Sequence, residues 1–222
     1  MQPELIAELL GPFFGAGSDV PLSRAQLEHI STYIDLLLRW NARVNLTAVR
    51  DPENVVTRHF GESLFAARHL CSSAANDQGR TTKDLIDVGS GAGFPGLPIK
   101  IWTPDMHLTL IESNHKKATF LREVVRALKL TDVDVFNRRA EDFPAGSADI
   151  VTLRAVEHFE AVLPVAAQLV KPAGRIALLI GEAQIASAQR LLPAYRWDTP
   201  LPIPLSSNRV LLAGSARGEP EQ

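Results

Sequence analysis

The chain has 222 residues, of which 45% are hydrophobic and 22% charged, with a formal net charge of −2 and a pI near 6.3. These values are typical of one soluble α/β core with a small extension, and they lack the basic excess of most nucleic-acid-binding proteins. No apolar run reaches the roughly 18 to 20 residues of a membrane span, and Glu4 stands where a signal peptide would be basic, so we expect a cytoplasmic protein. The single Cys71 excludes an intramolecular disulfide, and no histidine spacing suits a metal, so no metal site is expected.

The first part of the chain is expected to be helical. Hydrophobic residues recur at helical spacing from Leu27 to Leu38, and Ser23 with Gln26 has the arrangement of a capping box, which predicts a helix over about 23–40. Residues 71–83 are small and polar, as in a linker or surface loop. We therefore divide the chain into a helical N-terminal extension over 1–83 and a second domain over 84–222.

From residue 84 onward the hydrophobic period alternates between strand and helix. Strands are expected near 84–89, 107–112, 133–136, 148–154, 175–180, 198–203 and 208–214, and helices near 96–102, 114–129, 157–171 and 182–192. The segment Pro172–Gly174 is expected to be a turn, and the last two strands an antiparallel pair at the sheet edge. The pattern predicts a Rossmann-like α/β fold, with a mostly parallel seven-stranded sheet and helices on both faces.

Residues 84–98 (DLIDVGSGAGFPGLP) contain the first of these strands, a glycine-rich loop directly after it, and a helix start marked by proline. Gly89, Gly91 and Gly93 allow sharp turns and close approach of the backbone to a ligand, and Pro95 and Pro98 suit the first turn of a helix. The spacing from Gly91 also fits a dinucleotide fingerprint, so the loop alone leaves two cofactor classes open.

Asp87 favours S-adenosylmethionine (SAM) over a dinucleotide. A carboxylate two residues before the first glycine is poorly placed beside a pyrophosphate, whereas SAM carries a sulfonium and an ammonium group. Asp87 could attract that cationic end or hold the loop through backbone N–H groups. A structural glycine turn with a loop-capping aspartate is the alternative.

Further candidate residues stand at the ends of later strands, where a doubly wound sheet binds its ligands. Glu112 could accept hydrogen bonds from the ribose hydroxyls of an adenosine, or cap the helix before Lys116. Ala140 and Glu141 could border the adenine, and Arg154 is expected to point at the same mouth.

The chain resembles the ribosomal small-subunit methyltransferase G family, also called GidB. The resemblance rests on the proline-containing glycine loop, on Trp40–Asn41, Asn45–Thr47 and Arg58–His59, and on Leu110–Ser113 and Arg154–Ala155. It implies methyl transfer from SAM to N7 of one guanine in 16S ribosomal RNA. It also implies cofactor contacts at Gly89, Phe94, Ala140, Glu141 and Arg154, with Glu112 in the ribose position.

The sequence departs from the family pattern in three places. Glu62 stands where relatives usually have aspartate, and Ile180–Gly181 replaces a common Lys-Gly pair. The chain after residue 182 matches loosely, which leaves the role of Arg209 open. Phe94 could wall the cofactor pocket or pack as a loop hydrophobe.

The expected chemistry requires no catalytic base, because guanine N7 has a free lone pair and loses no proton on methylation. Clustered arginines are candidate RNA contacts, or ordinary solvated faces: Arg39, Arg43, Arg58, Arg138 and Arg139. Because the net charge is −2, we expect the substrate to be a folded small-subunit particle. We also expect the enzyme to be a monomer. The alternatives are a SAM-dependent methyltransferase that acts on another RNA or a small molecule, a nicotinamide-dependent enzyme, and a protein that binds SAM without catalysis.

Overall fold

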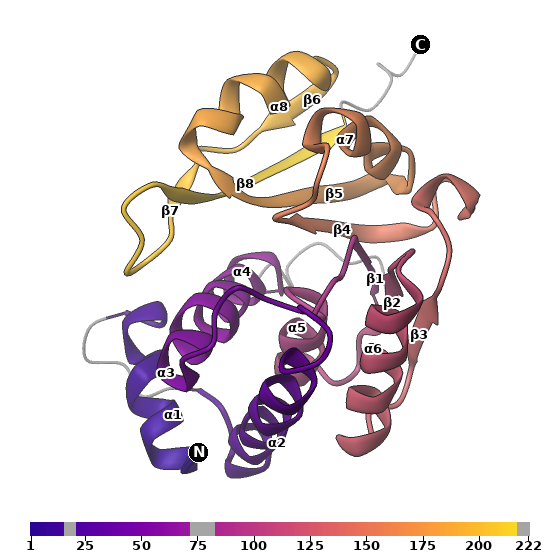
Figure 1. The fold of residues 1–222 in the computed structure, drawn as a ribbon. Helices are drawn as coiled ribbons and strands as arrows, with labels where there is room; N and C mark the ends of the chain where they lie inside the picture. The colour runs from indigo at the N-terminus through magenta and orange to yellow at the C-terminus, as the bar shows by residue number, and fades with distance from the viewer. Residues whose placement is uncertain (16–20, 72–82, 217–222) are drawn as a thin grey trace.

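The computed structural model describes residues 1–15, 21–71 and 83–216 (Figure 1). Most of the predicted linker at 71–83 lies outside the described residues; only Cys71 and Lys83 belong to them. None of the helices within these ranges is long and apolar enough to cross a membrane. The same ranges contain no cluster of three or more His, Cys, Asp or Glu side chains suited to a metal ion.

The N-terminal part is helical, as predicted. Its elements are α1 (Pro3–Leu10), the 3-10 turn η1 (Gly11–Phe13), α2 (Arg24–Asn41), α3 (Pro52–Val55), the π-helix η2 (Val56–Gly61) and α4 (Glu62–Cys71). The predicted capping box begins α2: the Ser23 hydroxyl accepts from Gln26 N at 3.3 Å, and Gln26 Oε1 accepts from Ser23 N at 2.8 Å. Because the cap satisfies two otherwise unpaired donors, it fixes where the helix begins.

The described residues from Asp84 to Ala216 form one mixed sheet and the helices that cover it. Its strands are β1 (Asp84–Val88), β2 (His107–Ile111), β3 (Val133–Phe136), β4 (Ala148–Arg154), β5 (Val170–Gly181), β6 (Tyr195–Trp197), β7 (Leu201–Pro202) and β8 (Arg209–Ala216). The order is β3-β2-β1-β4-β5-β8-β6, with β7 paired to β8 beside this path. The first five strands pair in parallel, and β8 is antiparallel to β5, β6 and β7. The predicted fold class and the antiparallel end of the sheet are confirmed.

Two local predictions were wrong. In place of the single strand expected at 198–203, the structure has two short strands, β6 just before this range and β7 inside it, which pair with different ends of β8. The turn expected at Pro172–Gly174 lies inside β5. Between the paired residues Ala148–Val170 and Ile150–Arg175, β5 advances by five residues while β4 advances by two. The extra residues are absorbed as an irregularity in the strand, and Gly174 allows it, since a Cβ there would lie 2.9 Å from the carbonyl oxygens of Ala148 and Asp149.

Alternate residues of each strand face different hydrophobic clusters. In β5, Ala177 and Leu179 pack with α1, α2 and α4, whereas Ile176, Leu178 and Ile180 pack on the other face. The first cluster also receives α5 (Gly96–Trp102) and α6 (His115–Ala127), and the second receives α7 (Phe159–Gln168) and α8 (Ile185–Leu191). Figure 1 shows these two helical layers on either side of the sheet. The N-terminal helices therefore share one core with a face of the sheet.

Candidate cofactor site

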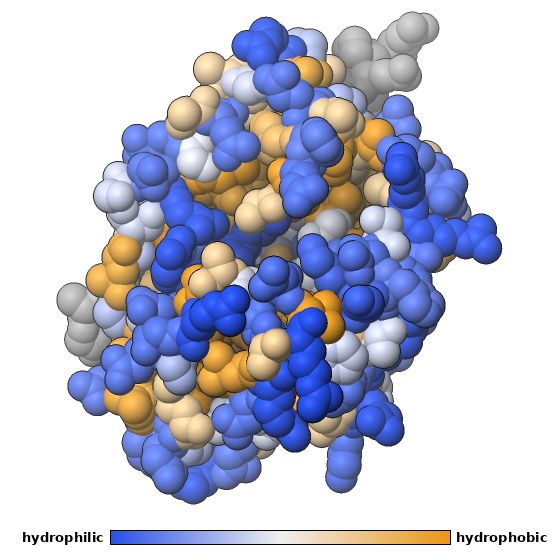
Figure 2. All heavy atoms as spheres, in the orientation of Figure 1, coloured by the Kyte–Doolittle hydropathy of each residue, from blue (hydrophilic) through white to orange (hydrophobic). Residues whose placement is uncertain are grey.

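A cavity of about 570 Å³ opens at the carboxyl ends of β1, β2 and β4. Strand order reverses between β1 and β4, and this is the place where doubly wound sheets bind ligands. The cavity is lined by residues at or just after the ends of four strands: Val88 and Gly89 at β1, residues 111–114 at β2, residues 138–141 after β3, and residues 155–158 after β4, with Lys117, Val162 and Val165. The face in Figure 2 is hollowed near its middle, with hydrophobic residues inside the hollow and mainly hydrophilic ones around it.

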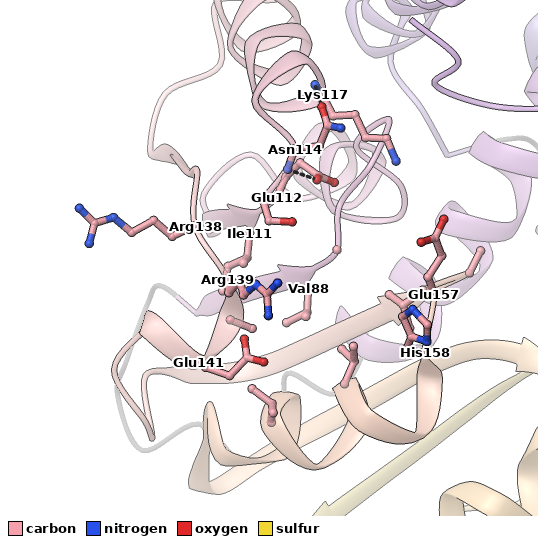
Figure 3. Close-up of a pocket in the computed structure, with 17 residues that line it drawn as sticks. Val88, Ile111, Glu112, Asn114, Lys117, Arg138, Arg139, Glu141, Glu157 and His158 are labelled. Carbon is pink, nitrogen blue, oxygen red and sulfur yellow. Dashed lines mark hydrogen bonds between the residues drawn. The ribbon is translucent and has the colours of Figure 1, made fainter.

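Charged side chains gather at both ends of this cavity. Figure 3 shows Arg139 and Glu141 at one end and Glu157 and His158 at the other, with Val88 between them. The side chain of Arg138 extends away from this group. Polar side chains therefore stand on two sides of Val88.

Glu112 joins the glycine loop to the segment after β2. Its side chain is buried, and its Oε2 accepts from Gly91 N at 2.9 Å while its Oε1 accepts from Asn114 N at 2.7 Å. A carboxylate has about four acceptor positions, so two remain for hydroxyl donors in the cavity. The structure assigns the helix cap to another residue, Asn114, whose Oδ1 accepts from Lys116 N and Lys117 N. An asparagine directly before a helical pattern is a signal that the sequence reasoning missed.

Gly89, Gly91 and Gly93, the glycines before α5, have different surroundings, although all three have positive φ. Gly89 lines the cavity, and a Cβ there would lie 2.8 Å from Val156 Cγ1. A Cβ on Gly91 would meet nothing closer than 3.8 Å, so only its φ of +56° requires glycine. Gly93 faces the N-terminal helices, where a Cβ would lie 2.3 Å from the Tyr33 hydroxyl oxygen.

Asp87 lies behind the loop and is not among the residues that line the cavity. Its Oδ2 accepts from Gly96 N at 3.2 Å, and its Oδ1 accepts from the Thr152 hydroxyl at 2.9 Å. Complete burial raises the pKa of this carboxyl to about 7, against the opposing hydrogen bonds. Of the two roles expected for Asp87, these contacts match the one that holds the loop through a backbone N–H.

Four other predicted cofactor contacts also lie outside the cavity lining: Gly91, Gly93, Phe94 and Arg154. Phe94 is 5% exposed and packs against the rings of Tyr33, His59 and Phe60. Arg154 is directed at the N-terminal helices, where its guanidinium donates to Glu62 and to the carbonyl of Arg58. Their contact with a cofactor stays a prediction.

The predicted RNA contacts fall into two groups. Arg138 and Arg139 are exposed at the cavity, next to η3 (Ala140–Asp142), whereas Arg39, Arg43 and Arg58 are exposed on the N-terminal part.

The structure also places two residues that depart from the family pattern. Ile180 is buried in the core under α7 and α8, and Glu62 binds both Arg154 and Arg209.

Comparison with known proteins places this site in context. The family model described as rRNA small subunit methyltransferase G matches residues 26–195. A "Ribosomal RNA small subunit methyltransferase G" of Chloroflexus aggregans is 41% identical over 181 residues, covering 78% of this chain and 73% of its own. One from Xylella fastidiosa is 39% identical over 183 residues, covering 82% of this chain and 79% of its own.

Solved structures share the fold at low sequence identity. A ribosomal protein L11 methylase from Lactobacillus delbrueckii has a TM-score of 0.57 at 13% identity, covering 71% of this chain and 79% of its own. A SAM-dependent methyltransferase from Aquifex aeolicus has a TM-score of 0.55 at 15% identity, covering 78% of this chain and 96% of its own. The predicted methyltransferase fold is confirmed.

Proposed function

The chain belongs to the rRNA small subunit methyltransferase G family, and from this premise we propose that it methylates N7 of a guanine in 16S ribosomal RNA, with SAM as the methyl donor. The observation that carries the proposal is the family match over residues 26–195, which spans the whole cavity at the ends of β1, β2 and β4.

The residues around the cavity fit the chemistry of SAM. Glu112 has unused acceptor positions for the two ribose hydroxyls, and the missing side chain of Gly89 leaves backbone open at the cavity wall. Ala140 and Glu141 would border the adenine, where a carboxylate can accept from the exocyclic amine. When bound, SAM supplies an electrophilic methyl group on a sulfonium.

The protein's contribution to the reaction would be position rather than proton transfer. Guanine N7 carries a lone pair and no proton, so the cavity needs no general base. Holding the nucleophile about 3 to 3.5 Å from the reacting carbon, in line, can lower a barrier by roughly 7 to 11 kcal/mol. Residues 155–158, which follow β4 at the far end of the cavity, would hold the substrate base.

The charge balance of the chain bears on how RNA is recognised. With a net charge of −2, few phosphates can be neutralised, so affinity for short RNA should be weak and its salt dependence shallow. We infer that the enzyme prefers a folded small-subunit particle that presents the guanine with its base accessible. Arg39, Arg43, Arg58, Arg138 and Arg139 would contact the RNA backbone of that particle.

One experiment tests the reaction itself. We expect mass spectrometry of 16S ribosomal RNA to show one 7-methylguanosine in cells that contain the protein and none in cells that lack it. Unchanged RNA modification, together with transfer of label from SAM to a small molecule or another RNA, would support the alternative methyltransferase. Thermal stabilisation by NAD but not by SAM would identify a nicotinamide enzyme instead.

A second experiment tests the particle. Purified protein, expected to run as a monomer in light scattering, is given labelled SAM and either small subunits or protein-free 16S RNA under matched salt and magnesium. Faster methylation of the subunits supports the proposal. Equal rates on both substrates would contradict it.

A further inference from the structure

Tyr33, on the N-terminal helix α2, touches the glycine loop directly. Its side chain is fully buried, and its hydroxyl donates a hydrogen bond to the backbone carbonyl of Ala92, within the loop. Its ring stacks on Phe94, with centroids 5.3 Å apart and planes 2° from parallel. A residue from the predicted extension therefore holds two neighbouring parts of the cofactor loop.

His59 reaches the same loop from the π-helix η2. Its ring lies 4.7 Å from that of Phe94 at an interplanar angle of 29°. Arg154 Nη2 lies 3.1 Å from His59 Nδ1, and a guanidinium can only donate, so Nδ1 accepts and Nε2 carries the proton. That proton is donated to the Thr47 hydroxyl at 2.8 Å, and burial, with Arg154 nearby, lowers the pKa of His59 to about 3, which keeps the ring neutral.

The loop needs an external support at this position. Gly89, Gly91 and Gly93 all have positive φ, which leaves the backbone few conformational restraints of its own. Glu112 holds Gly91 N from the cavity side, and Gly93 N donates to Ser90 O at 2.7 Å. Among the hydrogen bonds of the described residues, Tyr33 supplies the one to the Ala92 carbonyl, so it restrains the side of the loop that faces away from the cavity.

We propose that Tyr33 is a positioning residue for the cofactor: its hydroxyl fixes the Ala92–Gly93 peptide, and through it the orientation of Gly89 and Gly91 toward the bound SAM. The inference rests on the proposed function for the identity of the ligand. It makes the N-terminal helices part of the cofactor site, although none of their described residues lines the cavity.

The chain offers a matched control, because it has two tyrosines. Tyr195 also donates its hydroxyl to a backbone carbonyl, that of Ala167 at 3.3 Å, on the face of the sheet that carries α7 and α8. Tyr33→Phe and Tyr195→Phe each remove one such hydroxyl and keep the ring. We expect Tyr33→Phe to raise the Kd for SAM about fivefold by calorimetry, the equivalent of one hydrogen bond, and Tyr195→Phe to leave it unchanged.

Further measurements separate positioning from general stability. In kinetic assays Tyr33→Phe should raise the KM for SAM and leave the KM for small subunits unchanged. Tyr33→Phe in a Phe94→Leu background should weaken SAM binding by less than it does alone, because both residues act on the same loop. The inference would be overturned if Tyr33→Phe bound SAM with wild-type affinity and lost no more thermal stability than Tyr195→Phe. Failure of the wild-type protein to bind SAM would instead overturn the proposed function.

Discussion

The carboxylate of Glu62 lies 2.9 Å from Nη2 of Arg154, and only 4% and 7% of these side chains are exposed. The pair connects the beginning of α4 to the end of β4. Arg209, at the start of β8, shares the same carboxylate oxygen at 3.1 Å. One acid therefore compensates two guanidinium groups at the junction between the N-terminal helices and the sheet.

We expect Glu62→Gln to lower the free energy of unfolding by roughly 3 to 5 kcal/mol, because it leaves buried positive charge uncompensated. Chemical denaturation measures the change. Glu160→Gln is the control, since Glu160 pairs with Arg190 with both side chains about two-thirds exposed, and exposed pairs contribute about 0 to 1 kcal/mol. Equal effects of the two substitutions would show that burial does not strengthen the Glu62 contacts.

Glu112→Gln is expected to weaken SAM binding by roughly 1 to 3 kcal/mol, since a neutral amide forms weaker hydrogen bonds to ribose and has one acceptor oxygen in place of two. Calorimetry with SAM measures the loss. Asp142→Asn, at the end of η3 and outside the cavity lining, should bind SAM normally. A loss of thermal stability with intact SAM affinity would restrict Glu112 to joining the loop and Asn114.

Two buried groups give opposite pH dependences of stability. The pKa of Asp87 is about 7 in the folded protein, against an ordinary value of 3.8. Between these two pH values the folded protein keeps a proton on Asp87 that the unfolded chain releases. The contribution of Asp87 to stability therefore falls as pH rises from 3.8 to about 7. The pKa of His59 is about 3 when folded against 6.5, so the unfolded chain binds a proton that the folded protein does not, and stability is lost as pH falls below 6.5.

These slopes should largely cancel between about pH 4 and pH 6.5 in the wild type. In Asp87→Asn, the His59 dependence remains, so the free energy of unfolding should rise with pH through this window. In His59→Gln, the Asp87 dependence remains, and the free energy should fall. Denaturant titrations across the pH range measure both; a pH profile of Asp87→Asn parallel to that of the wild type would show that Asp87 does not titrate in this window.

The loop glycines should differ in their tolerance of alanine. Gly93→Ala places a Cβ 2.3 Å from the Tyr33 hydroxyl oxygen and 2.5 Å from Leu97 Cδ1, so we expect a large loss of folded protein. Gly91→Ala meets no such contact and should cost only the roughly 1 to 2 kcal/mol of a left-handed residue. Thermal denaturation compares the two, and equal losses would show that steric contact at Gly93 is relieved by movement of its neighbours.

Charge reversal of Arg138 and Arg139 tests the rim of the cavity. Replacing both by Glu should slow methylation of small subunits at least tenfold and reduce the salt slope of RNA binding by about 0.7 for each phosphate that is no longer neutralised. Arg190→Glu with Arg196→Glu, on α8 and β6, is the matched control. A wild-type rate in the Arg138 and Arg139 variant would identify this pair as a solvated edge.

Much of the fold and of the site was decided by local signals. The capping box at Ser23, the alternation of strands and helices, and the left-handed glycines are properties of short segments, and the ends of parallel strands meet at one edge of a sheet. For this reason the amino-acid sequence by itself is enough to assign Glu112, Ala140 and Glu141 to one cavity.

The direction of individual side chains was decided only by the tertiary structure. Asp87 and Arg154 lie at the carboxyl ends of β1 and β4, and Phe94 lies in the loop after β1. Yet Asp87 contacts Gly96, Phe94 contacts Tyr33, and Arg154 contacts Glu62. The partners of Phe94 and Arg154 come from helices that are distant in the chain, a pairing that no local pattern encodes. A buried charge is placed by a distant group that compensates its loss of water, and a buried ring is placed by the distant apolar groups that pack against it. Both kinds of partner are fixed only when the N-terminal helices pack against the sheet.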